Sequence, residues 1–180
     1  FQSGARKGGK KITDIPSVPA YWPDDEIVRH DMLDYAFEVE HTDQHLARMI
    51  AELEKRGQLD NTLIIVTSDH GMPFPRCKGY AYEDANHIPL AIRWPGGINK
   101  PGRVVHDFVN FTDLAPTLLD YAGIAAADSG MMEITGQSWR PILESGLAGR
   151  IVPSRDHTLI GKERTDVGRH GAADAGQHED

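Results

Sequence analysis

Residues 62–97 read TLIIVTSDHGMPFPRCKGYAYEDANHIPLAIRWPGG and indicate the fold more directly than any other part of the chain. The run at 63–66 is apolar and mostly β-branched, which predicts a strand buried on both faces, as in parallel sheets. It leads into Asp69 and His70, and a second strand is expected over 88–93. Ligands of open α/β sheets collect beyond the carboxyl ends of the strands. This carboxylate and imidazole are therefore our first candidates for holding a metal ion or a phosphate-like group.

The tripeptide Asp69-His70-Gly71 also has a plainer interpretation as a turn. In that case the aspartate accepts hydrogen bonds from nearby amides, the glycine supplies a positive φ, and the histidine is incidental. Lys78 follows in a loop rich in glycine, proline and aromatic residues. A cation near a metal site suits a tetrahedral dianion, whose charge must be neutralised from two sides, whereas a lone lysine is usually a solvated surface group.

Four stretches, taken in their order, resemble the second half of the catalytic domain of a sulfatase, in the alkaline-phosphatase-like superfamily. They are IIVTSDHG at 64–71, RCKGYAYED at 76–84, HIPLAIRWPGG at 87–97 and NFTDLAPTLL at 110–119. The resemblance covers residues 24–124 and implies an α/β fold: a doubly wound sheet with helices on both faces, incomplete in this chain. It also implies that Asp69 and His70 ligate a divalent cation, generally calcium, and that Lys78 binds the sulfate.

The nucleophile of the family has no counterpart in the sequence. Sulfatases use a formylglycine made from the cysteine of a Cys-x-Pro/Ala-x-Arg motif, and the hydrated aldehyde attacks sulfur. The one cysteine is Cys77, with Gly79 and Ala81 at the positions of Pro/Ala and Arg, so it is expected to be a small buried hydrophobe. The family's early Asp-Asp metal ligands are also missing upstream of Asp69. We therefore expect the chain to be the C-terminal part of a longer sulfatase, with the nucleophile outside it.

Several residues after Lys78 are weaker candidates for the site. His87 is a candidate substrate-binding residue, and Asn86 beside it is another, although loop packing explains both equally well. Three more residues lie close after Lys78 and either orient the lysine or form an exposed loop: Tyr82, Glu83 and Asp84.

A histidine pair lies in a predicted helix well before the Asp-His strand. His41 and His45 are one helical turn apart with Glu38 on the same side, a geometry that suits zinc. No glutamate follows His41 as in the His-Glu-x-x-His proteases, and a solvated helix face is the alternative.

Two classes of function stay open. The first is a metal-dependent sulfatase that hydrolyses sulfate esters or sulfamates, and the GMPFP run at 71–75 is similar to the branch acting on N-sulfated glucosamine of heparan-type glycans. A phosphodiesterase or phosphonate hydrolase of the same superfamily would reuse the Asp-His pair. The second class is a non-catalytic remnant that binds metal or glycan and hydrolyses nothing.

Composition restricts the partners. With 180 residues, 39% hydrophobic and 26% charged, the chain is long enough for one globular core. A formal net charge of −8 argues against a nucleic-acid partner. The basic run at 6–11 is either a solvated segment or a patch for a sulfated polysaccharide.

No apolar run has the length of a membrane span, and no signal peptide is present, although the family implies a periplasmic or secreted protein. No oligomeric state is specified.

The pattern along the chain predicts three regions. Residues 1–23 are expected to be an extended entry segment, because Pro16, Pro19 and Pro23 interrupt regular structure. Residues 24–124 form the sulfatase-like α/β part. Residues 125–180 are expected to be loosely structured, with a disordered tail over the last dozen residues.

Three further elements are expected within 24–124. A helix from Asp24 to about Arg56, ended by Gly57, has an apolar stripe that should pack on a sheet face. Residues 104–109 are a candidate strand, and 112–121 are a candidate helix with proline in its first turns.

Overall fold

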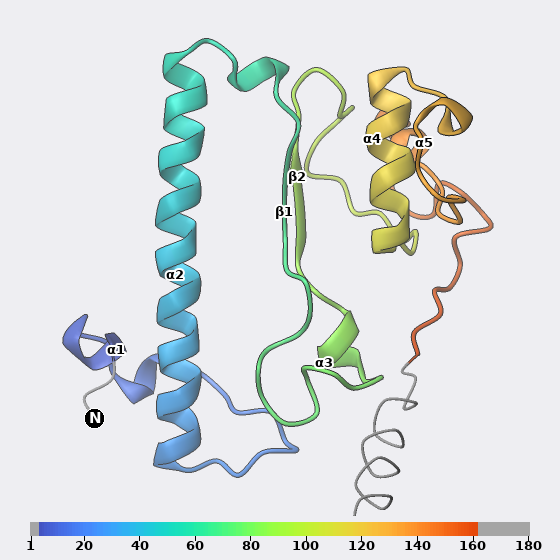
Figure 1. The fold of residues 1–180 in the computed structure, drawn as a ribbon. Helices are drawn as coiled ribbons and strands as arrows, with labels where there is room; N and C mark the ends of the chain where they lie inside the picture. Colours follow the sequence, from blue (N-terminus) through green and yellow to red (C-terminus); the bar gives the residue numbers. More distant parts are fainter. Residues whose placement is uncertain (1–3, 162–180) are drawn as a thin grey trace, which may run out of the picture. The chain divides into compact units, whose positions relative to one another are not determined.

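The structure, a computed structural model, describes residues 4–161 and contains both helices and strands (Figure 1). The tail expected to be disordered lies outside these residues. The contacts divide the chain into two compact units, Phe1–Asp60 and Asn61–Asp180, each of which is described by itself. Within the described residues, no helix has both the length and the apolar character that a membrane crossing requires. The domain boundaries given by the sequence stay a prediction.

The first unit is built on one long helix, α2 (Glu26–Lys55). It begins where the sequence predicts, because the Asp25 carboxylate accepts a hydrogen bond of 2.9 Å from the backbone N–H of Val28. It ends at Arg56, and Gly57 then adopts a φ of 65°, which favours glycine. The helix predicted from residue 24 to about 56 is thus confirmed. Its packing on a sheet face stays a prediction.

The entry segment is not wholly extended. Before its first proline it forms two short helical turns, α1 (Gly4–Lys7) and η1 (Ile12–Asp14), which pack on α2. Ala5, Ile15 and Leu33 form the buried core of this unit. The expectation of an irregular segment is wrong for residues 4–7 and 12–14, because the prolines that prevent helix formation all come later.

One lysine of the basic run is paired. The Lys10 ammonium forms a salt bridge with the carboxylate of Glu40 on α2. That lysine is therefore partly neutralised, which weakens the interpretation of the run as a polyanion-binding patch.

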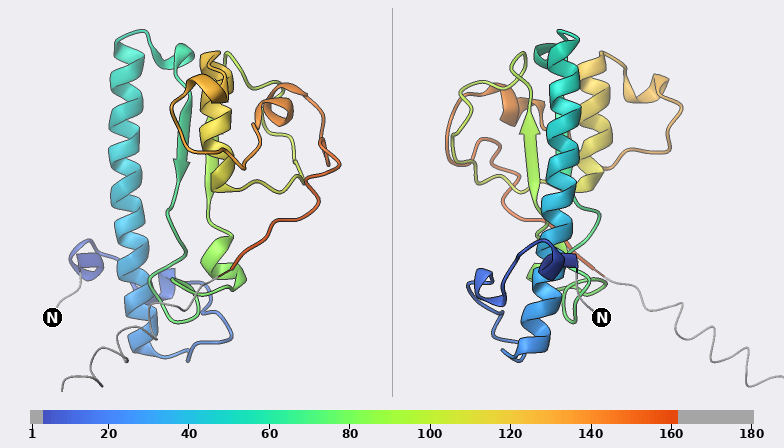
Figure 2. Two further views of the ribbon diagram at one scale, coloured as in Figure 1. Left: turned by 45° about the vertical axis from the view of Figure 1, so that its right-hand side comes forward. Right: turned by 90° about the vertical axis from the view of Figure 1, so that its left-hand side faces the viewer.

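The second unit contains a two-stranded sheet. β1 (Ile64–Thr67) and β2 (Leu90–Arg93) lie side by side in Figure 1 and in the left view of Figure 2, and they pair antiparallel. Both strands lie where the sequence predicts them, but β1 is half-buried and not buried on both faces. The expectation of a parallel neighbour is wrong for this pair, because the chain runs through the loop 68–89 and re-enters the sheet beside β1 in the opposite direction, with Ile64 opposite Arg93 and Thr67 opposite Leu90. A larger, doubly wound sheet stays a prediction.

The segment 104–109 is not a strand. It makes an isolated bridge between Val105 and Gly149. The Asp107 carboxylate then accepts the backbone N–H groups of Ile151 and Val152, at 2.7 and 2.6 Å. The N–H groups of residues 151 and 152 thus bind the Asp107 side chain, whereas in a sheet they would bind backbone carbonyls of a neighbouring strand. Regular strand pairing therefore stops here.

The helix expected over 112–121 is confirmed with a small shift. A 3₁₀ turn, η3 (Phe111–Asp113), leads directly into α4 (Leu114–Ala122). Asn110 caps the turn, since its side-chain oxygen accepts the N–H of Thr112 at 3.2 Å. The remaining short elements are α3 (Glu83–Asn86), η2 (Leu59–Asn61), η4 (Ala126–Asp128) and α5 (Arg140–Glu144).

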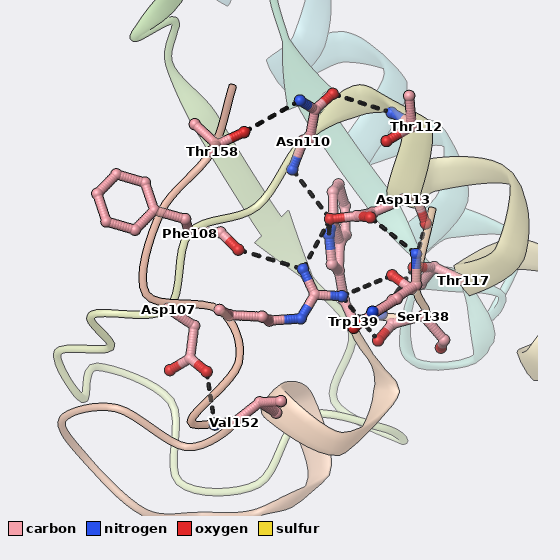
Figure 3. A network of polar contacts seen from close by, with 12 residues as sticks. Asp107, Phe108, Asn110, Thr112, Asp113, Thr117, Ser138, Trp139, Val152 and Thr158 are labelled. Carbon is pink, nitrogen blue, oxygen red and sulfur yellow. Dashed lines mark hydrogen bonds and ion pairs between the residues drawn. The ribbon is translucent and has the colours of Figure 1, made fainter. Parts of the chain in front are cut away.

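The carboxylate of Asp113, at the junction of η3 and α4, is the centre of a buried polar network (Figure 3). It accepts the backbone N–H groups of Asn110 at 3.0 Å and Gln137 at 2.9 Å. It also accepts the indole N–H of Trp139 at 3.0 Å and a guanidinium N–H of Arg155 at 2.7 Å. Burial raises the pKa of Asp113, but these hydrogen bonds outweigh it and the net shift is downward.

Arg155 completes the network from the far end of the described chain. Only 8% of its side chain is exposed, and its guanidinium also donates to the carbonyl oxygens of Phe108 and Gln137, at 3.1 and 2.7 Å. Residues 125–161 therefore have little regular structure, yet they are fixed to α4 by side-chain hydrogen bonds.

Replacing Arg155 by alanine should lower the free energy of unfolding by about 3–5 kcal/mol, because it leaves a buried carboxylate without its countercharge. The exposed Arg150→Ala variant is the control and should change it by less than about 0.5 kcal/mol. Denaturant unfolding measures both values. A loss for Arg155→Ala as small as that of the control would contradict the role of this ion pair.

The same contribution should depend on pH. The pKa of Asp113 is lower in the folded than in the unfolded chain, where it is about 3.9. The stabilisation is therefore complete above that value and is lost as the pH falls through the folded-state pKa. Denaturant unfolding at a series of pH values should show the free energies of unfolding of the parent chain and of Arg155→Ala converging over this range.

Candidate functional site

Asp69 and His70 lie just beyond the carboxyl end of β1, as the sequence predicts. The side chain of Asp69 is 83% exposed and that of His70 is 36% exposed, so both are open to a ligand. The Nε2 atom of His70 lies 3.3 Å from Oδ2 of Asp69. Its Nδ1 atom lies 2.8 Å from the carbonyl oxygen of Gly71.

These two contacts restrict the hydrogen-bonding roles of the two ring nitrogens. A carbonyl oxygen only accepts hydrogen bonds, so Nδ1 carries the hydrogen, and Nε2 of a neutral ring is an acceptor. That acceptor faces a carboxylate oxygen, and two acceptors at 3.3 Å need a proton or a cation between them. A histidine that donates its other N–H to a backbone carbonyl is also the usual arrangement of a metal ligand. The pair fits a divalent cation.

Gly71 is required by a close approach and not by its dihedral angles. It is not among the glycines with positive φ, so the interpretation of a turn with a left-handed glycine is wrong here. A Cβ atom on Gly71 would lie 2.0 Å from the carbonyl oxygen of Asp84 and 2.8 Å from the Cα of Ala85. The Gly71 N–H donates to the Ala85 carbonyl at 3.0 Å. The end of β1 is thus fixed against α3.

Lys78 lies in the same loop with its side chain exposed. Its backbone N–H donates to the carbonyl of Met72 at 3.0 Å, which closes the turn after the Asp-His pair. Within residues 4–161 its ammonium makes no salt bridge, so it is available to an anion. Cys77 beside it is fully buried, which confirms its predicted place in the interior.

The candidates that follow Lys78 separate into structural and exposed residues. Asn86 has a structural role, since its amide donates to the carbonyls of Tyr80 and Tyr82 at 3.0 and 2.9 Å. His87 and Glu83 pair with each other at 2.7 Å and are both largely exposed. Glu83 therefore binds His87 and not Lys78, and whether His87 contacts a substrate stays a prediction.

Sequence reasoning missed a pair of aromatic rings in this loop. The rings of Tyr80 and Tyr82 stack at a centroid distance of 5.9 Å with an interplanar angle of 21°. They are 47% and 55% exposed. The spacing of two residues between these tyrosines could have indicated that their rings are neighbours, because side chains two apart in an extended segment point the same way.

A hollow of about 370 Å³ in the second unit does not coincide with these residues. It is lined mainly by apolar side chains of β2, of the segment after it and of α5, including Ile92, Ile98 and Leu143. None of Asp69, His70, Lys78 and His87 lines it. The candidate site is an open loop surface.

The site offers two candidate metal ligands, Asp69 and His70. Among the described residues, no group of three or more histidine, cysteine, aspartate or glutamate side chains gathers in a way that holds a metal ion. Calcium prefers six to eight oxygen ligands, so Asp69 and His70 alone would supply only part of a coordination shell.

Comparison with known proteins bears on these observations. The sequence model of the sulfatase family matches residues 6–124, which hold the Asp-His pair, the lysine loop and α4. The chain belongs to the sulfatase family. That family implies an alkaline-phosphatase-like α/β fold, with which the helices and the small sheet are consistent.

Curated sulfatases are similar to the chain over much of its length. An N-acetylglucosamine-6-O-sulfatase of Bacteroides thetaiotaomicron is 37% identical over 118 residues, which are 63% of this chain and 20% of the relative. The human N-sulphoglucosamine sulphohydrolase is 33% identical over 133 residues, or 71% of this chain and 26% of the relative. An ulvan-active sulfatase of Formosa agariphila is 34% identical over 109 residues, or 59% and 18%. The chain thus spans about a fifth to a quarter of these sulfatases.

A Gly71→Ala substitution tests the contact that holds the site. The added methyl group overlaps the Asp84 carbonyl, so either β1 or α3 must shift, and we expect a loss of about 1–3 kcal/mol in the free energy of unfolding. Gly161→Ala is the matched control, because no atom lies within 4 Å of the position of its Cβ. Chemical denaturation of both variants gives the comparison, and equal stabilities would show that the loop is not held at this point.

Proposed function

We propose that the chain supplies part of the active site of a longer, metal-dependent sulfatase that hydrolyses sulfate esters or sulfamates of a glycan. Asp69 and His70 would hold a divalent cation, calcium being the family's usual ion, and Lys78 would bind the sulfate. The observation that carries this proposal is the approach of two potential metal-binding atoms, His70 Nε2 and Asp69 Oδ2, to 3.3 Å on an exposed loop. Family membership supplies the chemistry that this geometry suits.

Each residue has a distinct task in this proposal. A bound cation would polarise a sulfate oxygen. Lys78 presents an exposed ammonium from the same loop, and a charge-assisted hydrogen bond to the sulfate would strengthen as charge builds up on the transferring group. Gly71 and α3 hold the chain beyond β1 in place. In the proposed complex, the Lys78 ammonium and the bound cation would contact one anion from different positions.

A sugar is the substrate that the loop surface favours. Two of the relatives are named for glucosamine derivatives that carry sulfate and a third for the polysaccharide ulvan. The exposed, stacked rings of Tyr80 and Tyr82 offer broad apolar faces two and four residues after Lys78. Aromatic side chains with a few placed polar groups are typical of small-molecule sites, and a pyranose presents an apolar face of C–H groups to such rings. The GMPFP run supports the N-sulfated glucosamine branch.

The nucleophile of this reaction would come from outside these 180 residues. Cys77 lacks the formylglycine motif, and it is fully buried. We therefore assign it a packing role, and we expect the catalytic formylglycine in a segment that this sequence does not contain.

Lys78→Ala in the longer enzyme should reduce both kcat and kcat/KM for a sulfated substrate by about a hundredfold, the cost of removing one electrostatic donor. Lys100→Ala is the control, since Lys100 is an exposed lysine in a Pro-Gly loop outside the candidate site. Steady-state kinetics gives both parameters. A Lys78→Ala enzyme within twofold of the parent would remove Lys78 from the site.

Calcium binding by the 180-residue chain should be weak, because two ligands leave most of the coordination shell to water. Asp69→Asn should abolish what binding there is, whereas Asp128→Asn, an exposed aspartate in η4, should leave it unchanged. Isothermal titration calorimetry measures the affinity. Submicromolar binding by the chain alone would contradict the two-ligand assignment, and equal binding by both variants would place calcium elsewhere.

A further inference from the structure

The helix α2 carries a second pair of metal-ligating side chains, in the unit that does not contain the sulfatase-like loop. His41 and His45 are both exposed near the middle of the helix, one turn apart. Their Nε2 atoms lie 3.1 Å from each other. The two rings meet edge to face at a centroid distance of 4.7 Å, so each ring directs a nitrogen toward its neighbour.

We propose that His41 and His45 form a binding site for a borderline transition-metal cation, Cu²⁺, Ni²⁺ or Zn²⁺. A metal–nitrogen distance of about 2.05 Å and a separation of 3.1 Å between the nitrogens give an angle of about 98° at the metal. This angle lies between the right angle of octahedral and square-planar sites and the tetrahedral angle. Both imidazoles therefore reach one ion without a change in the helix backbone.

The 3.1 Å contact has a simple form without metal. One ring carries a hydrogen on Nε2 and donates it to the lone pair of the other ring. A shift of that hydrogen to Nδ1 of the same ring frees the second nitrogen without changing the charge of either side chain. The two Nε2 atoms can then bind one ion together as a chelate. The helix already places them side by side, because residues four apart are neighbours on one face.

The chemistry of the donors selects the cation. Imidazole nitrogen suits copper, nickel and zinc, whereas calcium prefers oxygen. No third histidine, cysteine or carboxylate gathers with the pair among residues 4–161, so water completes the shell and the site is open. The order of affinity should follow the general series for divalent ions, with copper bound most tightly. This selectivity separates the pair from the site at Asp69, and the inference does not rest on the proposed function.

Calorimetric titration of the 180-residue chain with each of Cu²⁺, Ni²⁺, Zn²⁺ and Ca²⁺ tests the site. We expect a site of one-to-one stoichiometry for the first three, tightest for copper, that calcium does not occupy. His41→Ala and His45→Ala should each weaken copper binding at this site by about tenfold or more, equivalent to about 1.4 kcal/mol. His106→Gln, an exposed histidine of the other unit, should leave the affinity unchanged.

A double variant, Asp43→His with His45→Ala, controls for the number of histidines. It keeps two imidazoles on the exposed helix but spaces them two residues apart, or about 200° around the axis, so that they cannot share an ion. Circular dichroism confirms that the helix is intact in each variant. The inference is overturned by parental copper affinity in the double variant, by unchanged affinity in both single variants, or by an absence of binding in the parent chain.

Discussion

The Asp113 carboxylate is the interaction on which the second unit depends. It accepts four hydrogen bonds from Asn110, Gln137, Trp139 and Arg155, and so joins the start of α4 to two segments that follow it in the chain. A buried carboxylate with a single partner would be costly, but with a guanidinium and three N–H groups its charge is compensated. Residues 125–161 contain only short helical elements, η4 and α5, and are joined to α4 through this compensation.

The candidate site depends on a second, steric constraint. Because Gly71 has no side chain, the chain beyond β1 approaches the backbone of α3 closely enough for a hydrogen bond to Ala85. The carbonyl of Gly71 is then free to accept from His70, which turns the other ring nitrogen toward Asp69. The same glycine thus fixes the loop and sets the tautomer of a candidate metal ligand. This dual role explains why a glycine that needs no positive φ occupies this position.

The sequence predicted the parts of the fold that depend on local physics. The limits of α2 follow from Asp25 and Gly57, and both strands follow from their apolar runs. It did not predict the antiparallel pairing, which depends on the path of the loop 68–89, or the failure of 104–109 to form a strand, which depends on Asp107 and amides more than forty residues away. The position of Asp69 and His70 directly after β1 was predicted from the apolar run before them, whereas their roles and that of Lys78 stay predictions. The roles of Gly71 and Arg155 require contacts that no local pattern encodes.

The most direct test of the account is a crystal structure of the longer sulfatase grown with calcium and sulfate. The account predicts an anomalous peak for calcium roughly 2.3–2.6 Å from a carboxylate oxygen of Asp69, with the Nε2 atom of His70 directed at the same ion. It also predicts a sulfate oxygen within about 3 Å of the Lys78 Nζ atom. A calcium ion held by other residues, with Lys78 extended into solvent and no anion near it, would contradict the central claim.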